Sequence, residues 1–194
     1  MVKKAFVLVA DGSEEIEFVT VYDVLVRAGF LVCSIGVNIS DSFARLSRGV
    51  KIIPDVQSLD PEAQLPDLIV LPGGAPGAKT FEESDAAAKL INRAQKEGVY
   101  IGAICAATKA LVRFGAEGGW KAKVTSHPSV QEMVVKGGWE YTQDRVVLDG
   151  KIITSRGPGT SLLFALTLVE TLCGREKREA SPARLISMVH RVLC

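Results

Sequence analysis

The chain has 194 residues, 47% of them hydrophobic, which is long enough to bury a full core as one domain over residues 1–194. Its 23 basic and 22 acidic residues leave a net charge of +1, so we expect no nucleic-acid partner. No apolar run approaches the roughly 20 residues of a membrane span. Acids follow the short apolar run at the N-terminus, so we expect no signal peptide. We expect a cytoplasmic protein, or in a eukaryote one that is also found in the nucleus or mitochondrion.

The first half of the chain alternates buried strands with helical segments. Residues 4–10 form a continuous apolar run, which is typical of a strand buried on both faces. The segment "DGSEE" then begins a predicted helix, with Asp11 and Glu14 spaced as a capping box and Gly29 at its end. Residues 38–54 predict short, irregular strands. Further apolar runs predict strands at residues 30–37, 67–74 and 99–104.

The second half predicts more helices and one hairpin. Asp149-Gly150 is a strong turn signal within the hairpin predicted over residues 145–155. The charge run at 175–179 is expected to be a linker. After it, Ser181 as N-cap and Pro182 begin a tail helix whose apolar face should dock on the body. That face carries Leu185, Val189 and Val192. The other helices are predicted at residues 83–97, 106–114 and about 157–173.

This alternation predicts an α/β fold with a mostly parallel sheet and helices on both faces. In such sheets, sites lie beyond the carboxyl ends of the strands. Three segments fall there, "ADGSEE", "LPGGAPG" and "AICAAT", and we therefore expect them to meet in one site.

Cys105 is the first candidate nucleophile, because it stands where a buried strand turns directly into a helix among small residues. This placement is that of a nucleophile elbow. Backbone N–H groups at the start of the following helix should favour the thiolate and lower the pKa of the thiol. The alternative is a buried, inert cysteine.

Glu17 differs from the neighbouring acids Glu14 and Glu15, which suit the first turn of a helix without any further role. Steps of three and four residues from Glu17 reach Val21 and Val24, so its carboxyl lies on an apolar stripe. Burial there would raise the pKa of the carboxyl and suit a general acid or base. The alternative is a carboxyl that reaches water at the helix end.

The glycine-rich segment after residue 71 matches neither a Walker loop nor a dinucleotide-binding fingerprint. Gly73 and Gly74 are candidates to present backbone N–H groups to an oxyanion, although an ordinary turn explains them too. His127 is a candidate base for Cys105, or a hydrogen-bonded loop histidine. Arg156 precedes a helix start, a place that suits an anion and equally a structural turn.

The four cysteines are Cys33, Cys105, Cys173 and Cys194, and none forms a C-x-x-C pair. The two histidines do not complete a zinc pattern, so we expect no metal. Reduced thiols are expected in a chain of this class, although an even number of cysteines leaves a disulfide open.

Taken together, the motifs resemble those of the ThiJ/PfpI superfamily, and closely its Parkinsonism-associated DJ-one branch. They run in order from about residue 4 to residue 173, and the tail is the least similar part. The resemblance implies a flavodoxin-like sandwich that forms a homodimer. The matching segments are "ADGSEEIE", "YDVLVRAG", "LSRGVKIIPD", "LPGGAPGA", "AICAATKAL", "VTSHPS" and "DGKIITSRGPGTSLLFAL".

The resemblance also implies site roles. Cys105 is then the reactive cysteine with Glu17 as its partner, Gly74 and Ala106 supply oxyanion N–H groups, and Arg48 reaches the partner's site. The implied activities are cofactor-free conversion of methylglyoxal to lactate and removal of early glycation adducts from proteins. Two alternatives remain, a redox sensor or chaperone acting through oxidation of Cys105 to sulfinate, and a PfpI-like cysteine peptidase.

The chain departs from the resemblance at the elbow. Ala107 stands where well-known members have glycine, and its methyl group is expected to crowd the turn slightly. No clear acid is available to orient His127, which weakens a protease-type triad. Leu46 and Ile53 stand where some animal members carry cysteines, so redox behaviour that depends on those is not expected.

Overall fold

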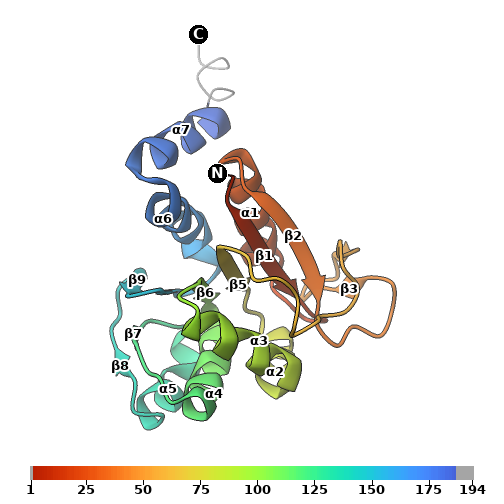
Figure 1. Cartoon of the computed structure of the whole chain (residues 1–194), viewed down its shortest axis with the longest axis vertical. Coiled ribbons are helices and arrows are strands. Elements are labelled where there is room, and N and C mark those ends of the chain that lie inside the picture. Colours follow the sequence, from red (N-terminus) through yellow and green to blue (C-terminus); the bar gives the residue numbers. More distant parts are fainter. Residues whose placement is uncertain (1, 187–194) are drawn as a thin grey trace.

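A six-stranded sheet lies at the centre of the computed structural model, which describes residues 2–186 and, of residues 181–186, only the backbone (Figure 1). The strand order is β2-β1-β5-β6-β10-β9, and every pair is parallel except the antiparallel edge strand β9. This is the flavodoxin-like order, and the predicted α/β class is confirmed. The strands are β1 (Lys4–Val9), β2 (Leu31–Gly36), β5 (Leu68–Leu71), β6 (Tyr100–Ile104), β9 (Val146–Asp149) and β10 (Ile152–Ser155).

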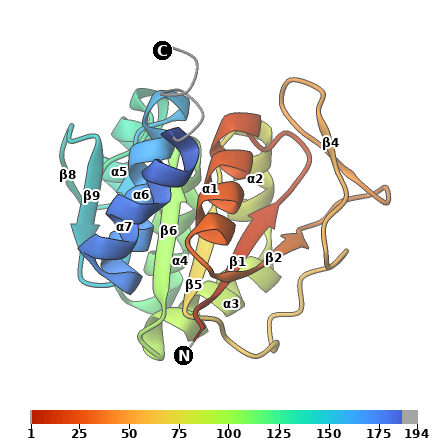
Figure 2. The same ribbon diagram turned by 90° about the horizontal axis from the view of Figure 1, so that it is seen from above.

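Helices cover both faces of the sheet (Figure 2). On one face lie α1 (Glu15–Arg27), α6 (Ser161–Cys173) and α7 (Arg175–Ile186). On the other lie α2 (Ala75–Glu83), α3 (Asp85–Lys96) and α4 (Thr108–Gly118), with the short α5 (Gln131–Lys136) beside α4. No helix within residues 2–186 is both long and apolar enough to cross a membrane.

The core explains why the central strands read as continuous apolar runs. Each residue of β5 is fully buried, because helices cover the sheet on both sides. The largest fully buried side chains are Phe81, Phe114 and Phe164, one from each of α2, α4 and α6. Burying a side chain of this size contributes about 1.5–3 kcal/mol, so the helices that carry the site loops are held firmly on the sheet.

Two small strand pairs lie outside the main sheet. β3 (Ala44–Arg45) and β4 (Lys51–Ile52) are short strands within residues 38–54, as predicted, and they pair in antiparallel fashion. β7 (Lys123–Val124) and β8 (Glu140–Tyr141) pair in parallel and were not predicted. A further segment follows the outer edge of β2, where Gly36 N donates to Val56 O at 2.8 Å and Leu59 N donates to Gly36 O at 3.0 Å.

The predicted capping box at the start of α1 is wrong. Asp11 Oδ1 accepts a hydrogen bond from Arg45 N at 2.8 Å and so holds the β3 hairpin. Glu14 is the N-cap instead, with its carboxylate accepting from Glu17 N at 2.9 Å. A carboxylate in either place stabilises the positive end of the helix dipole, which is why the spacing alone did not distinguish them.

Two helices depart from the predictions. The glycine-rich segment, predicted as a loop, continues into α2, and Ser84 then caps α3 at residue 85. The charge run at 175–179 is helical, not a linker, and ion pairs of Arg175 with Glu179 and of Arg178 with Glu170 support it. Ser181 lies inside α7, so it is not an N-cap.

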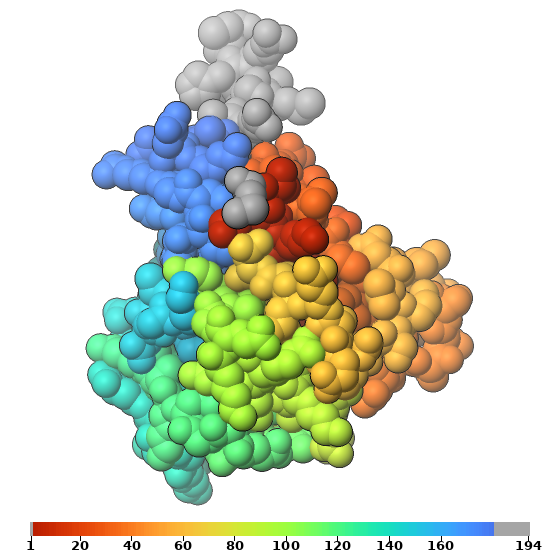
Figure 3. Space-filling view, viewed as in Figure 1, coloured from red at the N-terminus to blue at the C-terminus, as the bar shows by residue number. Residues whose placement is uncertain are grey.

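The space-filling view shows α7, in blue, beside the red and orange surface of β1 and α1 (Figure 3). A hollow between them is lined by Lys3, Phe30 and Cys173 among others. The side chains of Leu185, Val189 and Val192 lie outside the described part, so their docking stays a prediction. Along residues 2–186, Cys33, Cys105 and Cys173 are free thiols.

Candidate active site

Three loops meet at the carboxyl ends of β1, β5 and β6, as the sequence predicts. Glu14 N, after β1, donates to Gly73 O, after β5, at 3.0 Å. Cys105 follows β6 directly. The order of the strands reverses between β1 and β5, and this switch point is where flavodoxin-like sheets form their sites.

Cys105 occupies a strained elbow. Its φ is 64°, a left-handed value that is rare for a residue with a side chain and costs about 1–3 kcal/mol. A short 3-10 turn, η1 (Cys105–Ala107), leads from it into α4, and His127 N donates to Cys105 O at 3.2 Å. Cys105 as a whole residue is only 8% exposed. The next residues have ordinary helical angles, with φ of −66° at Ala107, so the extra methyl group there does not strain the backbone.

Glycines allow the β5 loop to approach the thiol. A Cβ at Gly73 would lie 2.5 Å from Glu17 Oε2 and 2.6 Å from Cys105 Cβ. Gly74 has φ of 86°, and its N–H and that of Ala106 are close enough to the Cys105 thiol to lower its pKa. Gly73 N instead donates to Glu17 Oε2 at 2.6 Å. The predicted oxyanion role of Gly73 is therefore wrong, because its N–H binds the Glu17 carboxyl. The N–H groups of Gly74 and Ala106 act on the Cys105 sulfur instead.

Glu17 is fully buried, as its apolar stripe predicts. Oε2 accepts from Gly73 N, and Oε1 has no hydrogen-bond partner of ordinary geometry among the described residues. The neighbours that act on this carboxyl are the thiol of Cys105, the N–H of Gly73 and the charge of Glu14. Burial without a cation raises the pKa of Glu17 to about 7, against weaker lowering by the thiol and by Gly73 N–H. A carboxyl with this pKa can both give and take a proton near neutral pH.

The thiol pKa departs from the prediction. Burial, and then the nearby Glu17 carboxylate, raise the pKa of Cys105 to about 12, although the N–H groups of Ala106 and Gly74 lower it. The predicted lowering by the helix start is present but is outweighed. Two facing acids of this kind titrate as a pair, so the thiolate forms most readily when Glu17 holds the proton and its negative charge is absent.

His127 lies at the same pocket but is not paired with the thiol. Its ring Nδ1 lies 2.7 Å from Ser129 Oγ and accepts from Ser129 N at 3.2 Å. The predicted role as base for Cys105 has no hydrogen bond to support it among the described residues. Ser129 was not predicted as a partner of His127. The sequence does carry a signal for it, because a proline after a possible capping residue, as in His127-Pro128, is typical of a helix start.

The pocket above the thiol has a volume of about 350 Å³. Arg48 lies on its wall in this same chain, because Glu15 accepts hydrogen bonds from Arg48 N and, at 2.7 Å, from Ser47 Oγ. Arg156 does not line this pocket, since its guanidinium donates to Gln143 O at 3.1 Å. This contact supports the structural alternative for Arg156, and its anion or interface role stays a prediction.

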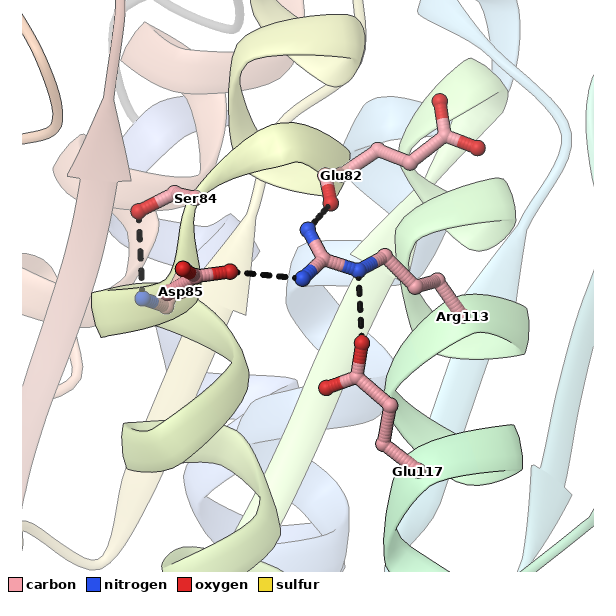
Figure 4. Close-up of polar contacts among 6 residues, drawn as sticks. Glu82, Ser84, Asp85, Arg113 and Glu117 are labelled. Atoms are coloured by element: carbon pink, nitrogen blue, oxygen red, sulfur yellow. Dashed lines mark hydrogen bonds and ion pairs between the residues drawn. The ribbon is translucent and has the colours of Figure 1, made fainter.

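A cluster around Arg113 fixes the helices that carry the site (Figure 4). The guanidinium donates to Asp85 at 2.7 Å, to Glu117 at 2.8 Å and to the backbone oxygen of Glu82. It thereby joins the end of α2, the start of α3 and the middle of α4. Lys109 on α4 adds an ion pair with Glu82 at 2.8 Å. Gly74 is the N-cap of α2 and a short turn leads from Cys105 into α4, so this cluster joins the two helices that follow the site loops.

Across residues 2–186, no group of three His, Cys, Asp or Glu side chains converges to hold a metal. A larger hollow of about 500 Å³ lies between α3 and α4, and it is lined by the paired charges of the Arg113 cluster. The pocket of Cys105 is therefore the candidate active site, because Cys105, Gly74 and Ala106 line it and the buried carboxyl of Glu17 lies beside the thiol.

A cysteine lifted from the edge of a flavodoxin-like sheet, beside a buried carboxyl, defines a class of α/β proteins with a nucleophilic thiol. The DJ-1/PfpI family profile matches residues 3–171. The chain belongs to this family, and the resemblance of its motifs is confirmed.

Relatives match over most of their length. The chain is 39% identical over 176 residues to the glutathione-independent glyoxalase DJR-1.2 of Caenorhabditis elegans, covering 90% of this chain and 91% of that protein. It is 33% identical over 184 residues to the glutathione-independent glyoxalase DJ-1 of Schizosaccharomyces pombe, covering 91% and 95%. The crystal structure of Drosophila melanogaster DJ-1beta superposes with a TM-score of 0.88 at 39% identity, covering 96% of this chain and 98% of that one.

Proposed function

We propose that this protein is a cofactor-independent glyoxalase that converts methylglyoxal to lactate, and that the same chemistry acts on early glycation adducts of proteins. One observation carries the proposal. The Cys105 elbow brings a thiol, a buried carboxyl of raised pKa and two N–H donors to one point. The glyoxalase names of the nematode and yeast relatives support it.

The reaction needs no external oxidant or reductant. Glu17 carboxylate takes the thiol proton, Cys105 thiolate attacks the aldehyde carbon, and the new oxyanion, held by N–H groups of Gly74 and Ala106, takes that proton back from Glu17 to give a hemithioacetal. Glu17 carboxylate then removes the hydrogen of that carbon as a proton, which gives an enediolate, and returns it to the neighbouring carbon, while the hydroxyl proton moves from the first oxygen to the second. The product is the lactate thioester of Cys105. Water hydrolyses it and restores the thiol. A positioned acid–base contributes typically ~100–10,000-fold and one oxyanion donor ~100–1,000-fold.

The test measures lactate formed from methylglyoxal in metal-free, thiol-free buffer by the wild type, Cys105→Ala, Cys105→Ser and Glu17→Ala. Without the nucleophile the covalent route is closed, so both Cys105 variants should lose at least about 1,000-fold. Near-normal turnover by Cys105→Ser would contradict the proposal. Denaturation curves of each variant serve as the control for folding.

A redox sensor or chaperone is the second candidate, and the Glu17 carboxyl favours it. When protonated, this buried group can donate a hydrogen bond to an oxygen of a Cys105 sulfinate. Mass spectrometry of Cys105 after mild peroxide, beside steady-state kinetics with methylglyoxal, separates the two candidates. A sulfinate with negligible turnover supports the sensor. A peptidase is disfavoured, because the ring of His127 bonds to Ser129 rather than to Cys105 or an acid.

A homodimer is proposed from an exposed apolar surface on α1 and the residue that follows β4. Val19, Val26 and Ile53 are 46%, 48% and 75% exposed around a hollow of about 390 Å³. A second copy would cover them, and it would bring Arg48, which follows the β3 strand, toward the partner's site. Light scattering should show a dimer that Ile53→Lys dissociates, and a wild-type monomer would contradict it. We place this dimer in the cytoplasm, with dicarbonyls or glycated proteins as substrates.

A further inference from the structure

Ser129 determines which nitrogen of His127 carries the proton. A backbone N–H can only donate, and Ser129 N donates to Nδ1 at 3.2 Å, so Nδ1 is the acceptor. Ser129 Oγ lies 2.7 Å from the same nitrogen and donates to it as well. The imidazole thus caps the 3-10 turn η2 (Pro128–Val130). In a neutral imidazole with Nδ1 as acceptor, the proton is on Nε2.

The edge of the ring that carries Nε2 borders the reactive space. His127 is exposed and lines the pocket of Cys105. A Cβ built at Gly157 would lie 3.8 Å from His127 Cδ2, the ring carbon next to Nε2, and 3.9 Å from both Cys105 Sγ and Glu17 Oε1. Gly157 therefore keeps open a space that these three groups share. Nε2 itself has no hydrogen-bond partner along residues 2–186.

We propose that Ser129 is a positioning residue that holds His127 as the Nε2–H tautomer, so that His127 donates a hydrogen bond to the second oxygen of a dicarbonyl bound on Cys105. The proposal rests on the proposed glyoxalase function. In the enediol step negative charge develops on this oxygen, which lies one carbon away from the oxyanion held by Gly74 and Ala106. A neutral N–H donor stabilises that charge without transferring a proton.

This assignment divides the work of the site among three groups. Glu17 moves the proton between the two carbons, the backbone N–H groups hold the first oxygen, and His127 holds the second. It also excludes His127 as the base that activates the thiol, because the nitrogen near the pocket already carries a proton and the other is occupied by Ser129.

The first experiment reads the tautomer without any substrate. Protein with ¹⁵N-labelled histidine is examined by NMR at neutral pH, and His190→Gln assigns the signals of His127. We expect a protonated Nε2 and an unprotonated Nδ1. Ser129→Ala keeps the backbone N–H but loses the hydroxyl, so the tautomer ratio should fall about 2- to 10-fold. Ser129→Thr should restore it, and Ser47→Ala, the same change on another wall of the pocket, should leave it unchanged. A protonated Nδ1, or a ratio insensitive to Ser129→Ala, overturns the proposal.

The second experiment separates a donor from a base. His127→Gln keeps an N–H donor but removes the ring, and His127→Leu removes both. For lactate formation we expect kcat to fall about 100- to 1,000-fold in His127→Leu and about tenfold or less in His127→Gln. Alkylation of Cys105 by iodoacetamide should be nearly equal in both variants and in the wild type. Slow alkylation in both variants would show a base and overturn the proposal. If the wild type forms no lactate, the glyoxalase fails, while the tautomer and alkylation results still stand.

Discussion

Two clusters of ionisable groups in this protein follow opposite rules. Around Arg113 each charge meets an opposite charge, because the guanidinium contacts two carboxylates and a backbone oxygen near the surface (Figure 4). Around Cys105 two acids face one another in the interior, and the carboxyl has no cation beside it among the described residues. The first cluster fixes three helices in place. The second stays poised between two protonation states, which is what a proton-transferring site needs.

The largest expected effect comes from removing the acid of the second cluster. Glu17→Gln keeps an oxygen that can accept from Gly73 N but cannot carry a proton between carbons. Lactate formation should fall ~100–10,000-fold, mostly in kcat. Iodoacetamide labelling should show that Cys105 is still accessible. Turnover within threefold of the wild type would mean that the two acids do not act together.

The glycine that joins the two acids gives the next effect. Gly73→Ala places a methyl group against Glu17 Oε2, Cys105 Cβ and the backbone oxygen of Ile104. A small shift of the backbone cannot relieve all three contacts. Stability should fall by about 2–4 kcal/mol, measured by urea denaturation, together with activity. Gly159→Ala is the matched control, since nothing lies within 4 Å of its added methyl group. Equal stability of the two variants would contradict the packing described for the elbow.

The raised pKa of Glu17 predicts how stability depends on pH. Its pKa is about 7 in the folded protein and 4.5 ordinarily, so between these values the folded chain retains a proton that the unfolded chain releases. The contribution is complete below about pH 4.5 and is lost as pH rises through 7, by up to about 3 kcal/mol. Glu17→Gln lacks this loss and should be more stable than the wild type at pH 8. A constant difference between the two proteins from pH 5 to pH 8 would refute the burial argument.

The smallest effect is expected in the first cluster. Arg113→Met keeps much of the side-chain packing but leaves the Glu82 oxygen without its partner, and should lower stability by about 1–2 kcal/mol. Added salt should reduce the difference, because Asp85 and Glu117 are largely exposed. Arg175→Met, which removes an exposed pair of the same i,i+4 kind, should show no measurable change. An activity loss above about tenfold in Arg113→Met would show that the helix clamp also shapes the site.

The sequence predicted the sheet and the two acids because both depend on apolar periodicity. The strands around Leu8 and Ile69 are buried on both faces, so their pattern is continuous, and Glu17 was identified because it interrupts such a pattern on one helix face. These signals are local. They can be recognised in the sequence because the position of a residue along its strand or helix determines whether the fold buries it.

What the sequence did not predict depends on contacts between distant segments. The start of α2 was not predicted because Gly73 and Gly74 are typical turn residues. Their proximity to Glu17 and Gly12 is what requires glycine at these two positions. The charge run at 175–179 forms a helix because Arg178 reaches Glu170 on the preceding helix. Likewise, the thiol pKa follows from a carboxylate 88 positions away in the chain, which no local rule about helix starts includes.

The segment along β2 has a consequence for how copies of this protein associate. Val56 and Leu59 occupy backbone groups on the outer edge of Gly36, so that edge is a poor template for an added strand. Association through a continuous intermolecular sheet is thereby discouraged, and the proposed dimer would form through side chains of α1 and Ile53 instead. Such a contact can separate and re-form without unfolding either copy, so subunit exchange should be reversible and free of aggregation.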